Sequence, residues 1–363
     1  MTALSDTAAA DTADSRPSAF HLGFFTHVHG ADATELYRGV VELFVAAEEL
    51  GYDSGWVAQH HFHAEHGRLS SPLVLLAGAA ARTSRIQLGT AIVALPFEDP
   101  LRLAEDAAVL DALSGGRLQL GLGAGVPVGA EFTAFGQDPA SRHQTYDAKE
   151  RVLRDALAGR PLPGPGSGAG QPDSGGPVLQ PAAPGLRRRL WSSTTRPDAV
   201  RAAAAAGQGL LLGVGPHDVV QQQLAAAFRA TWDEHWPGRP APVAAVRGVF
   251  PAASRDEAAA VLAPDVGWYL PHHVTAGWAR DASISTQELL GLMNVQYGTP
   301  QDIVTSLERD AVFSAGATHL VAAIQSESTP LAQVRRHLEV LATEIAPALG
   351  WRPGSSEVTH AGQ

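Results

Sequence analysis

Histidines gather in two short stretches of the chain, and imidazole is the side chain best suited to proton transfer near neutral pH. Each stretch directly follows a short apolar run, the first holding His27 and His29 and the second holding His60, His61, His63 and His66. A metal site would need further His or Asp ligands after other apolar runs, but Gly, Ser, Thr and Arg stand there. The sequence therefore favours acid–base chemistry over metal binding, with His63 and His66 as solvated loop residues.

A second candidate site precedes an Ala-rich segment that is expected to be a helix from Pro197. Thr194, Thr195 and Arg196 stand directly before it. Hydroxyl groups, a guanidinium and the free N–H groups of a helix N-terminus together suit a phosphate. The same threonines could instead cap the helix. The residues alone leave both interpretations open.

Three glycines, at positions 121, 123 and 125, would let the backbone approach a ligand closely because no Cβ intervenes. They do not match the dinucleotide-binding fingerprint, since the third glycine is at the wrong offset and the following VPVGAEF does not open a helix. The sequence argues against a Rossmann site. The alternative is a strand end that needs room.

Short apolar runs alternate with amphipathic or Ala-rich segments from Phe20 onward, which is the pattern of parallel βαβ units. Strands are predicted at 20–26, 54–58, 86–93, 117–122, 189–193, 209–213, 243–250 and 318–324. Eight such units favour a closed α/β barrel of the (β/α)8 TIM type, with an open doubly wound sheet as the alternative. In a barrel, the loops after the strands share one mouth, so the candidate residues would converge there.

The chain is predicted to form one barrel domain over 20–350, with a disordered leader at 1–19 and a flexible tail at 351–363. The segment 160–184 is so rich in Pro and Gly that it reads as an insertion, either a lid or an inert surface loop. The stretch 254–313 is longer than one helix requires, which predicts an extended segment after strand seven. The insertion and the extended segment would depart from a minimal barrel.

Composition excludes several classes of protein. Asp and Glu outnumber Lys and Arg 37 to 26, so the net charge of -11 offers no basic surface for nucleic acid. The absence of cysteine excludes disulfides, thiolate-bound clusters and thiol nucleophiles. The chain has neither a signal peptide nor an apolar run of membrane-spanning length. These features predict a soluble, cytoplasmic protein without a membrane or nucleic-acid partner.

Residues 56–62 (WVAQHHF) resemble luciferase-like flavin monooxygenases of the FMN type. The resemblance continues in SPL at 71–73, TSRI at 83–86, LGTA at 88–91, LP at 95–96, PLRLAED at 100–106 and LSGGR at 113–117. It is dense from 50 to 145 and weaker as far as Gly298-Thr299-Pro300. The family implies a luciferase-like TIM barrel with FMN at its mouth, assembled as a homodimer through the early helices.

The resemblance also implies roles for individual residues. His60 matches the family histidine that acts in acid–base chemistry, and Gln59 stands where the family often has a carboxylate. Ala91 and Ile92 match the position of a non-proline cis peptide behind the flavin. Thr26, His27 and His61 are the candidates for the substrate pocket.

The remaining implied contacts concern the rest of the cofactor. Gly123 and Ala124 fall where the family lines the flavin site, and Ala124 replaces an arginine often found near the phosphate. Arg142 matches another basic position. The hypothesis is that four residues hold the FMN phosphate, namely Arg142, Thr194, Thr195 and Arg196. No metal is expected.

The predicted function is an FMN-dependent monooxygenase that uses reduced FMN and dioxygen on a small organic substrate. A separate NAD(P)H-dependent flavin reductase would supply the reduced flavin as a transient partner. The alternatives are a deazaflavin- or flavin-dependent hydride-transfer enzyme, a non-catalytic flavin-binding homologue and a metal-dependent hydrolase. Substrate identity does not follow from the sequence.

Overall fold

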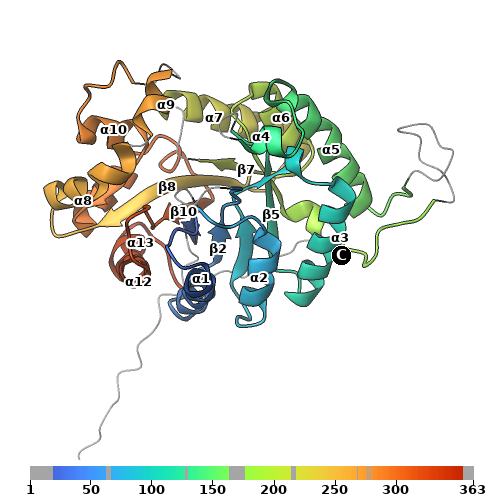
Figure 1. The fold of residues 1–363 in the computed structure, drawn as a ribbon, viewed down its shortest axis with the longest axis horizontal. Coiled ribbons are helices and arrows are strands. Elements are labelled where there is room, and N and C mark those ends of the chain that lie inside the picture. Colours follow the sequence, from blue (N-terminus) through green and yellow to red (C-terminus); the bar gives the residue numbers. More distant parts are fainter. Residues whose placement is uncertain are drawn as a thin grey trace, which may run out of the picture.

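The computed structural model describes residues 19–62, 67–126, 130–162, 176–213, 218–267, 269–275, 277 and 279–354. Within these residues, parallel strands close into a barrel that helices surround (Figure 1). The strands follow one another in chain order, and the ring closes because β10 pairs with both β1 and β8. The predicted (β/α)8 barrel is confirmed. The alternative of an open sheet is wrong, because an open sheet would leave two unpaired edges.

Every barrel strand lies within three residues of its predicted bounds. The ring consists of β1 (His21–Thr26), β2 (Ser54–Val57), β3 (Gln87–Thr90), β5 (Leu118–Gly123), β6 (Leu190–Ser193), β7 (Gly209–Leu212), β8 (Val243–Pro251) and β10 (His319–Ala323). The predicted strand 86–93 is split, because the ladder is interrupted at Ala91 and Ile92 and the short β4 (Val93–Ala94) pairs with β5 alone.

Helices follow the strands as the alternating pattern predicts. The helices of the first half are α1 (Ala33–Glu49), α2 (Pro72–Ala80), η1 (Leu95–Phe97), α3 (Pro100–Leu113), α4 (Glu131–Ala134), η2 (Pro139–Ser141) and α5 (Arg142–Leu157). Those of the second half are η3 (Leu186–Arg189), α6 (Pro197–Ala205), α7 (Asp218–His235), α8 (Arg255–Gly267), α9 (Leu270–Thr275), α10 (Thr286–Leu292), α11 (Pro300–Leu307), α12 (Leu331–Val340), η4 (Leu341–Ile345) and α13 (Ala346–Ala348).

The extended segment after the seventh predicted strand is confirmed. Helices α8, α9 and α10 gather at one side of the barrel, at the left of Figure 1, around the far end of β8. There β9 (Gln296–Gly298) pairs in parallel with residues 249–251, beyond the part of β8 that belongs to the ring. The segment therefore enlarges one side of the mouth without entering the barrel.

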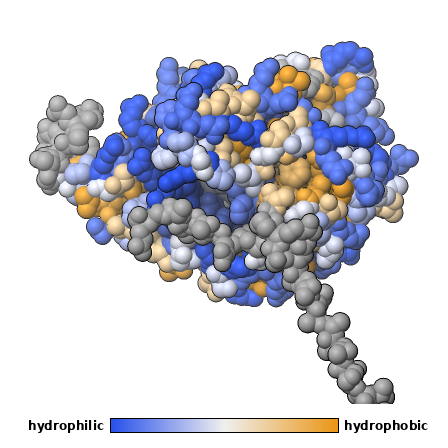
Figure 2. Space-filling model, turned by 180° about the vertical axis from the view of Figure 1, so that it is seen from behind, coloured by the Kyte–Doolittle hydropathy of each residue, from blue (hydrophilic) through white to orange (hydrophobic). Residues whose placement is uncertain are grey.

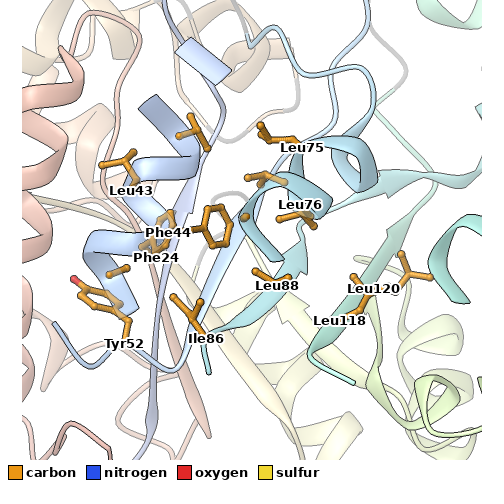
Figure 3. Close-up of a cluster of buried hydrophobic side chains, with 14 of the residues drawn as sticks. Phe24, Leu43, Phe44, Tyr52, Leu75, Leu76, Ile86, Leu88, Leu118 and Leu120 are labelled. Atoms are coloured by element: carbon orange, nitrogen blue, oxygen red, sulfur yellow. The ribbon is translucent and has the colours of Figure 1, made fainter. Parts of the chain in front are cut away.

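Apolar side chains between the ring and the helices form the main core. Phe24 of β1 meets Phe44 of α1 with ring centroids 4.9 Å apart. Figure 3 shows how the side chains of α1 and α2 pack against the strands. The labelled residues are Phe24, Leu43, Phe44, Tyr52, Leu75, Leu76, Ile86, Leu88, Leu118 and Leu120. This packing fixes the helices on the first strands, and with them the loops that carry the histidines.

Inside the ring, two indoles fill part of the core. Trp56 and Trp191 are buried and meet edge to face, with centroids 5.5 Å apart. A Cβ on Gly89 would lie 2.2 Å from the Trp56 ring, and one on Gly209 would lie 2.3 Å from the Trp191 ring. Glycine is required at both positions because the indoles fill the space that a side chain would take.

Two motifs of the family resemblance have structural roles at the end of the barrel opposite the mouth. Glu48 accepts the N–H groups of Arg85 and Ile86 at 2.7 and 2.8 Å. Burial raises the pKa of Glu48, but the N–H groups of Ile86, Ser84 and Arg85 outweigh burial and hold the pKa below its usual value. Arg117 donates to the carbonyls of Ala80 and Ile86 at 3.1 and 2.8 Å. These contacts close the loops that precede β3 and β5.

The predicted domain boundaries need correction. Trp351, placed in the flexible tail, is fully buried, and its Nε1 donates to Asp53 Oδ2 at 3.0 Å. The fold therefore extends beyond position 350. The segment 160–184 is only partly an excursion, because Leu179 and Ala183 belong to the main core. The insertion at 163–175, the leader at 1–18 and the tail from 355 lie outside the described residues. The face of the molecule shown in Figure 2 carries both hydrophilic and hydrophobic areas.

A half-buried histidine at the start of β10 makes the stability of the fold depend on pH. His319 stacks on His21 of β1 with ring centroids 4.6 Å apart. Burial, reinforced by the neighbouring His21, lowers the pKa of His319 well below its usual value. In the unfolded chain this imidazole therefore takes up a proton near pH ~6.5, whereas in the folded chain it stays neutral at that pH. The stabilisation is complete above that pH and is lost as the pH falls below it.

We expect the temperature midpoint of unfolding to decrease as the pH is lowered from about 7.5 to about 5.5. The decrease should be smaller in His319→Gln, because glutamine cannot titrate. Circular dichroism at several pH values measures both slopes. The exposed His235 of α7 provides the control, since His235→Gln should keep the wild-type slope. Equal slopes in wild type and His319→Gln would contradict the assignment.

Candidate active site

The structure brings His60 and His27 together at the mouth. His60 Nε2 lies 3.3 Å from His27 Nδ1, because β1 and β2 are neighbours in register and both residues follow their ends. The His60 N–H donates to the Leu69 carbonyl at 2.8 Å. Gly67 has φ +102°, and a Cβ there would lie 2.6 Å from His60 Cδ2. The backbone therefore fixes the imidazole of His60 from two sides.

A cavity of about 470 Å³ opens beside this pair. Its described lining residues are Ala33, Tyr37, His60, His61, Phe62, Arg68 and Ser70. His61, predicted for the substrate pocket, lines it. Thr26 does not line it, because the residue is fully buried and its hydroxyl bonds Gln325 and accepts the Val28 N–H. Thr26 and His27 thus lie close to the pocket, whereas His63, Glu65 and His66 are outside the described residues.

Gln59 ties together the segments that follow β2 and β4. Its Oε1 accepts the Ala94 N–H at 2.8 Å, and its Nε2 donates to Glu98 Oε1 at 2.7 Å. The Ala91–Ile92 peptide is cis, as the family resemblance implied. A Cβ on Gly123 would lie 2.9 Å from Ile92 Cδ1. The predicted ring-binding segments are therefore neighbours, and Ala124 follows directly at the end of β5.

Two arginines of the predicted phosphate site also lie close together. Arg142, at the first turn of α5, donates through Nη1 to the Pro139 carbonyl at 3.0 Å, while its buried Nε has no partner. Arg196 precedes α6. The pKa of His143 is lowered by burial and then by both guanidinium groups. Two positive charges therefore converge on this side of the mouth.

Arg196 is not free, which the sequence did not reveal. It pairs with Asp198 at 2.8 Å and with Asp147 at 3.3 Å. The guanidinium of Arg196 is the main cause that lowers the pKa of Asp198. An acid in the first turn of α6 was visible in the sequence as a possible partner. Asp147 was not, because its approach depends on the placement of α5.

The alternative role for the threonines, capping α6, is wrong. The N-cap of α6 is Arg196, and no side chain bonds the helix from that position. Thr194 accepts the Arg196 N–H through Oγ1 at 3.2 Å, and Thr195 is exposed. Both hydroxyls therefore stand beside a helix N-terminus and an arginine, as a phosphate site requires.

Two polar residues near the mouth were missed by the sequence analysis. Glu98 receives the Gln59 amide, and Lys149 of α5 donates to the carbonyls of Pro96 and Glu98 at 2.7 Å each. Burial lowers the pKa of Lys149. These contacts hold η1 in place. No motif signalled them, since they join elements about fifty residues apart.

The described part of the chain contains neither a metal site nor a membrane-spanning helix. No group of three or more His, Asp or Glu side chains there could hold a metal ion. None of the helices described is both long and apolar enough to cross a membrane. The chemistry of the described mouth therefore depends on imidazole, guanidinium, amide and hydroxyl groups.

The model of the luciferase-like monooxygenase family matches residues 19–322. The chain belongs to this family. Membership confirms the resemblance drawn from residues 56–62 and the later motifs. The description of that family agrees with the predicted class of enzyme, an oxidoreductase of the monooxygenase type.

Relatives of the family match parts of the chain. An uncharacterised protein of Sinorhizobium fredii is 33% identical over 220 residues, which cover 59% of this chain and 61% of that protein. The 4-hydroxyprotoasukamycin monooxygenase of Streptomyces nodosus subsp. asukaensis is 40% identical over 139 residues, or 38% of this chain and 36% of that enzyme. The chain thus spans less than two thirds of the length of these relatives.

Solved structures share the fold over almost their whole length. Monooxygenase RslO1 from Streptomyces bottropensis has a TM-score of 0.74 at 23% identity, covering 91% of this chain and 99% of that one. The oxygenating constituent of 3,6-diketocamphane monooxygenase from Pseudomonas putida, in complex with FMN, has a TM-score of 0.71 at 19% identity, covering 90% of this chain and 98% of that one. The coenzyme F420 dependent tetrahydromethanopterin reductase of Methanopyrus kandleri has a TM-score of 0.63 at 18% identity, covering 90% of this chain and 99% of that one. These likenesses establish the barrel.

Proposed function

We propose that this protein is an FMN-dependent monooxygenase that acts with reduced FMN and dioxygen on a small organic substrate. The observation that carries the proposal is the convergence, in a luciferase-like barrel, of the His60 segment, the 91–92 peptide and Gly123 beside two arginines. Reduced FMN, when bound, supplies the electrons that activate dioxygen. A separate NAD(P)H-dependent flavin reductase is part of the proposal, as the family resemblance implies.

The residues present fit such a cofactor. Gly123 packs directly against Ile92 of the 91–92 peptide, since a Cβ there would lie 2.9 Å from Ile92 Cδ1, and Ala124 beside it is small. The unpartnered, buried Nε of Arg142 offers a donor, and Arg196 with Thr194 and Thr195 offers others. A phosphate is the group that such a combination of charge and N–H donors recognises.

The chain's own part in the chemistry is to bind, shield and move a proton. His60 Nε2 lies within hydrogen-bonding distance of His27 Nδ1, so a proton can pass between the two rings, and His60 lines the cavity. Two imidazolium rings at this distance repel each other, so the pair favours at most one positive charge. Phe97 and Phe135 pack edge to face against His61, the residue that follows His60.

A hydride-transfer enzyme that uses a deazaflavin is the second candidate, and the fold it shares with the F420 dependent reductase favours it. A non-catalytic flavin-binding protein is the third. Equilibrium binding of FMN and of F420 separates the first two, because only one should bind tightly. A reductase-coupled assay with isotopically labelled dioxygen then tests the reaction. Label in the product would support monooxygenation, and F420 binding without oxygen uptake would overturn it.

We expect the double variant Arg142→Ala/Arg196→Ala to weaken FMN binding by about 10²-fold, since two charge-assisted contacts to the phosphate are lost. Riboflavin, which lacks the phosphate, should bind wild type and variant alike. Asp198→Asn should tighten FMN about threefold by releasing Arg196 from its exposed partner. Fluorescence titration measures all three affinities. Unchanged FMN affinity in the double variant would dispose of this phosphate site.

The proposal includes a homodimer through the early helices. Val74 of α2 and Val109 and Leu113 of α3 are 75%, 46% and 68% exposed. Apolar side chains on neighbouring helices are what a subunit contact covers. Sedimentation of wild type and Leu113→Glu tests this, since only the wild type should sediment as a dimer.

A further inference from the structure

Four phenylalanines gather at the mouth although they come from three separate segments. Phe62 follows β2, Phe97 ends η1, Phe132 belongs to α4 and Phe135 follows α4. Phe97 lies 4.8 Å from Phe132 and 5.1 Å from Phe135, and Phe135 lies 5.5 Å from Phe62, measured between ring centroids. We refer to these four residues as the aromatic cluster.

The cluster is anchored at one end and open at the other. Phe132 is 3% exposed, whereas Phe135 is 37% and Phe62 is 70% exposed. A chain that buries Phe132 in its core gains nothing in stability by presenting Phe62 to water. The exposed rings therefore suit a ligand.

Phe97 and Phe135 are stacked, Phe62 is tilted against Phe135, and Phe132 meets Phe97 edge to face. Phe97 and Phe135 are inclined by 20°, and Phe62 and Phe135 by 35°. His61 closes the side with its ring edge-on to Phe97 and Phe135. A further flat ring can extend such a stack with favourable quadrupole contacts, which a saturated chain of the same area cannot make.

The backbone at Phe62 adds an independent observation. Its φ is +61°, a left-handed conformation that a bulky side chain rarely adopts. Uncommon backbone conformations of this kind persist at binding and catalytic sites. At this position the conformation belongs to a residue that lines the same cavity as His60.

We propose that the aromatic cluster is the substrate-binding surface and that it selects planar aromatic substrates over aliphatic ones of equal size. The cavity of about 470 Å³ has room for a fused-ring molecule. Phe62, His61 and His60 line it in sequence, so a ring on the cluster lies next to the histidine pair. The proposal rests on the proposed function for the reaction, but not for the binding.

The test is equilibrium binding without flavin, using 2-naphthol and its saturated counterpart decahydro-2-naphthol, which has the same carbon skeleton and hydroxyl. We expect the wild type to bind 2-naphthol about tenfold more tightly. The double variant Phe62→Leu/Phe135→Leu keeps apolar side chains but removes two rings. It should lose about tenfold in 2-naphthol affinity and leave decahydro-2-naphthol unchanged. Val261→Ala, on the exposed face of α8, is the control.

Three results would overturn the proposal. The first is that the wild type binds the two alcohols with equal affinity. The second is that the double variant keeps its 2-naphthol affinity while its thermal midpoint matches that of the wild type. The third is that the wild type and the control are dimers and the double variant is not. The last would assign the cluster to a contact between two copies of the chain. Binding of 2-naphthol through the cluster without oxygen uptake in the presence of reduced FMN would refute the proposed function and leave the cluster's role standing.

Discussion

We expect His60→Ala to lower kcat by about 10²–10⁴-fold, the usual contribution of a positioned acid or base. Among the described residues, His60 is the histidine that both lines the cavity and lies within hydrogen-bonding distance of a second imidazole. Because the proposed phosphate contacts come from other elements and the His60 side chain is not among the proposed ring contacts, FMN affinity should change little. A reductase-coupled oxygen assay at saturating reduced FMN, with a separate FMN titration, measures the two effects.

The control is His235→Ala, on the exposed surface of α7, which should keep full activity. His27→Ala should lower kcat by less than His60→Ala and move the pH profile, since His27 acts through His60. The effect of the double variant should fall well short of the product of the single effects, as expected for two groups that act as a unit. A His60→Ala protein with wild-type kcat would exclude the histidine from the proton transfer.

The ring of strands was predictable because its causes are local. Each strand is a short apolar run such as 118–123, bounded by a helix stop and a loop, and neighbouring runs pair in chain order. The start of α3 shows how directly the local sequence determines where a helix begins. Asp99 caps the helix by accepting two N–H groups at 2.9 and 3.0 Å, and Pro100 begins it. Both residues are adjacent in the chain, so no tertiary knowledge was needed.

The predictions that failed concern contacts between distant parts of the chain. The burial of Trp351 depends on Asp53, and the pairing of Arg196 depends on Asp147, so each contact joins distant parts of the chain. The composition of 351–363 is that of a tail. Only the structure shows that the indole of Trp351, at its start, is buried in the core. Sequence periodicity carries no signal for a single side chain that packs far from its own element.

The departures from the family pattern have local compensations. Where the resemblance implies a carboxylate at position 59, Gln59 holds the carboxylate of Glu98 at 2.7 Å. Where it implies an arginine at position 124, Arg142 and Arg196 stand on neighbouring elements. The charges that the sequence lacks at two positions are therefore supplied close by. In the proposed FMN site, these groups would take the place of the two that the family pattern has.

The largest expected effect on stability lies away from the site, at a buried ion pair. Arg247 of β8 is fully buried, and its Nε and Nη2 bond the two oxygens of Asp310 at 2.5 and 3.1 Å. Burial raises the pKa of Asp310, but Arg247 outweighs burial and keeps the pKa below its usual value. Arg247→Met leaves the carboxylate buried and unpaired. It should lower the free energy of unfolding by about 3–5 kcal/mol.

Urea unfolding of three variants tests this account. Arg247→Met/Asp310→Leu removes both charges and should recover most of the loss, because no uncompensated charge remains. Arg82→Met breaks an exposed pair with Glu42, whose side chains are 53% and 56% exposed, and should change stability by less than about 1 kcal/mol. The deficit of Arg247→Met should also shrink at acid pH, where Asp310 can take up a proton. If the double variant is as unstable as Arg247→Met, packing rather than the buried charge sets the loss.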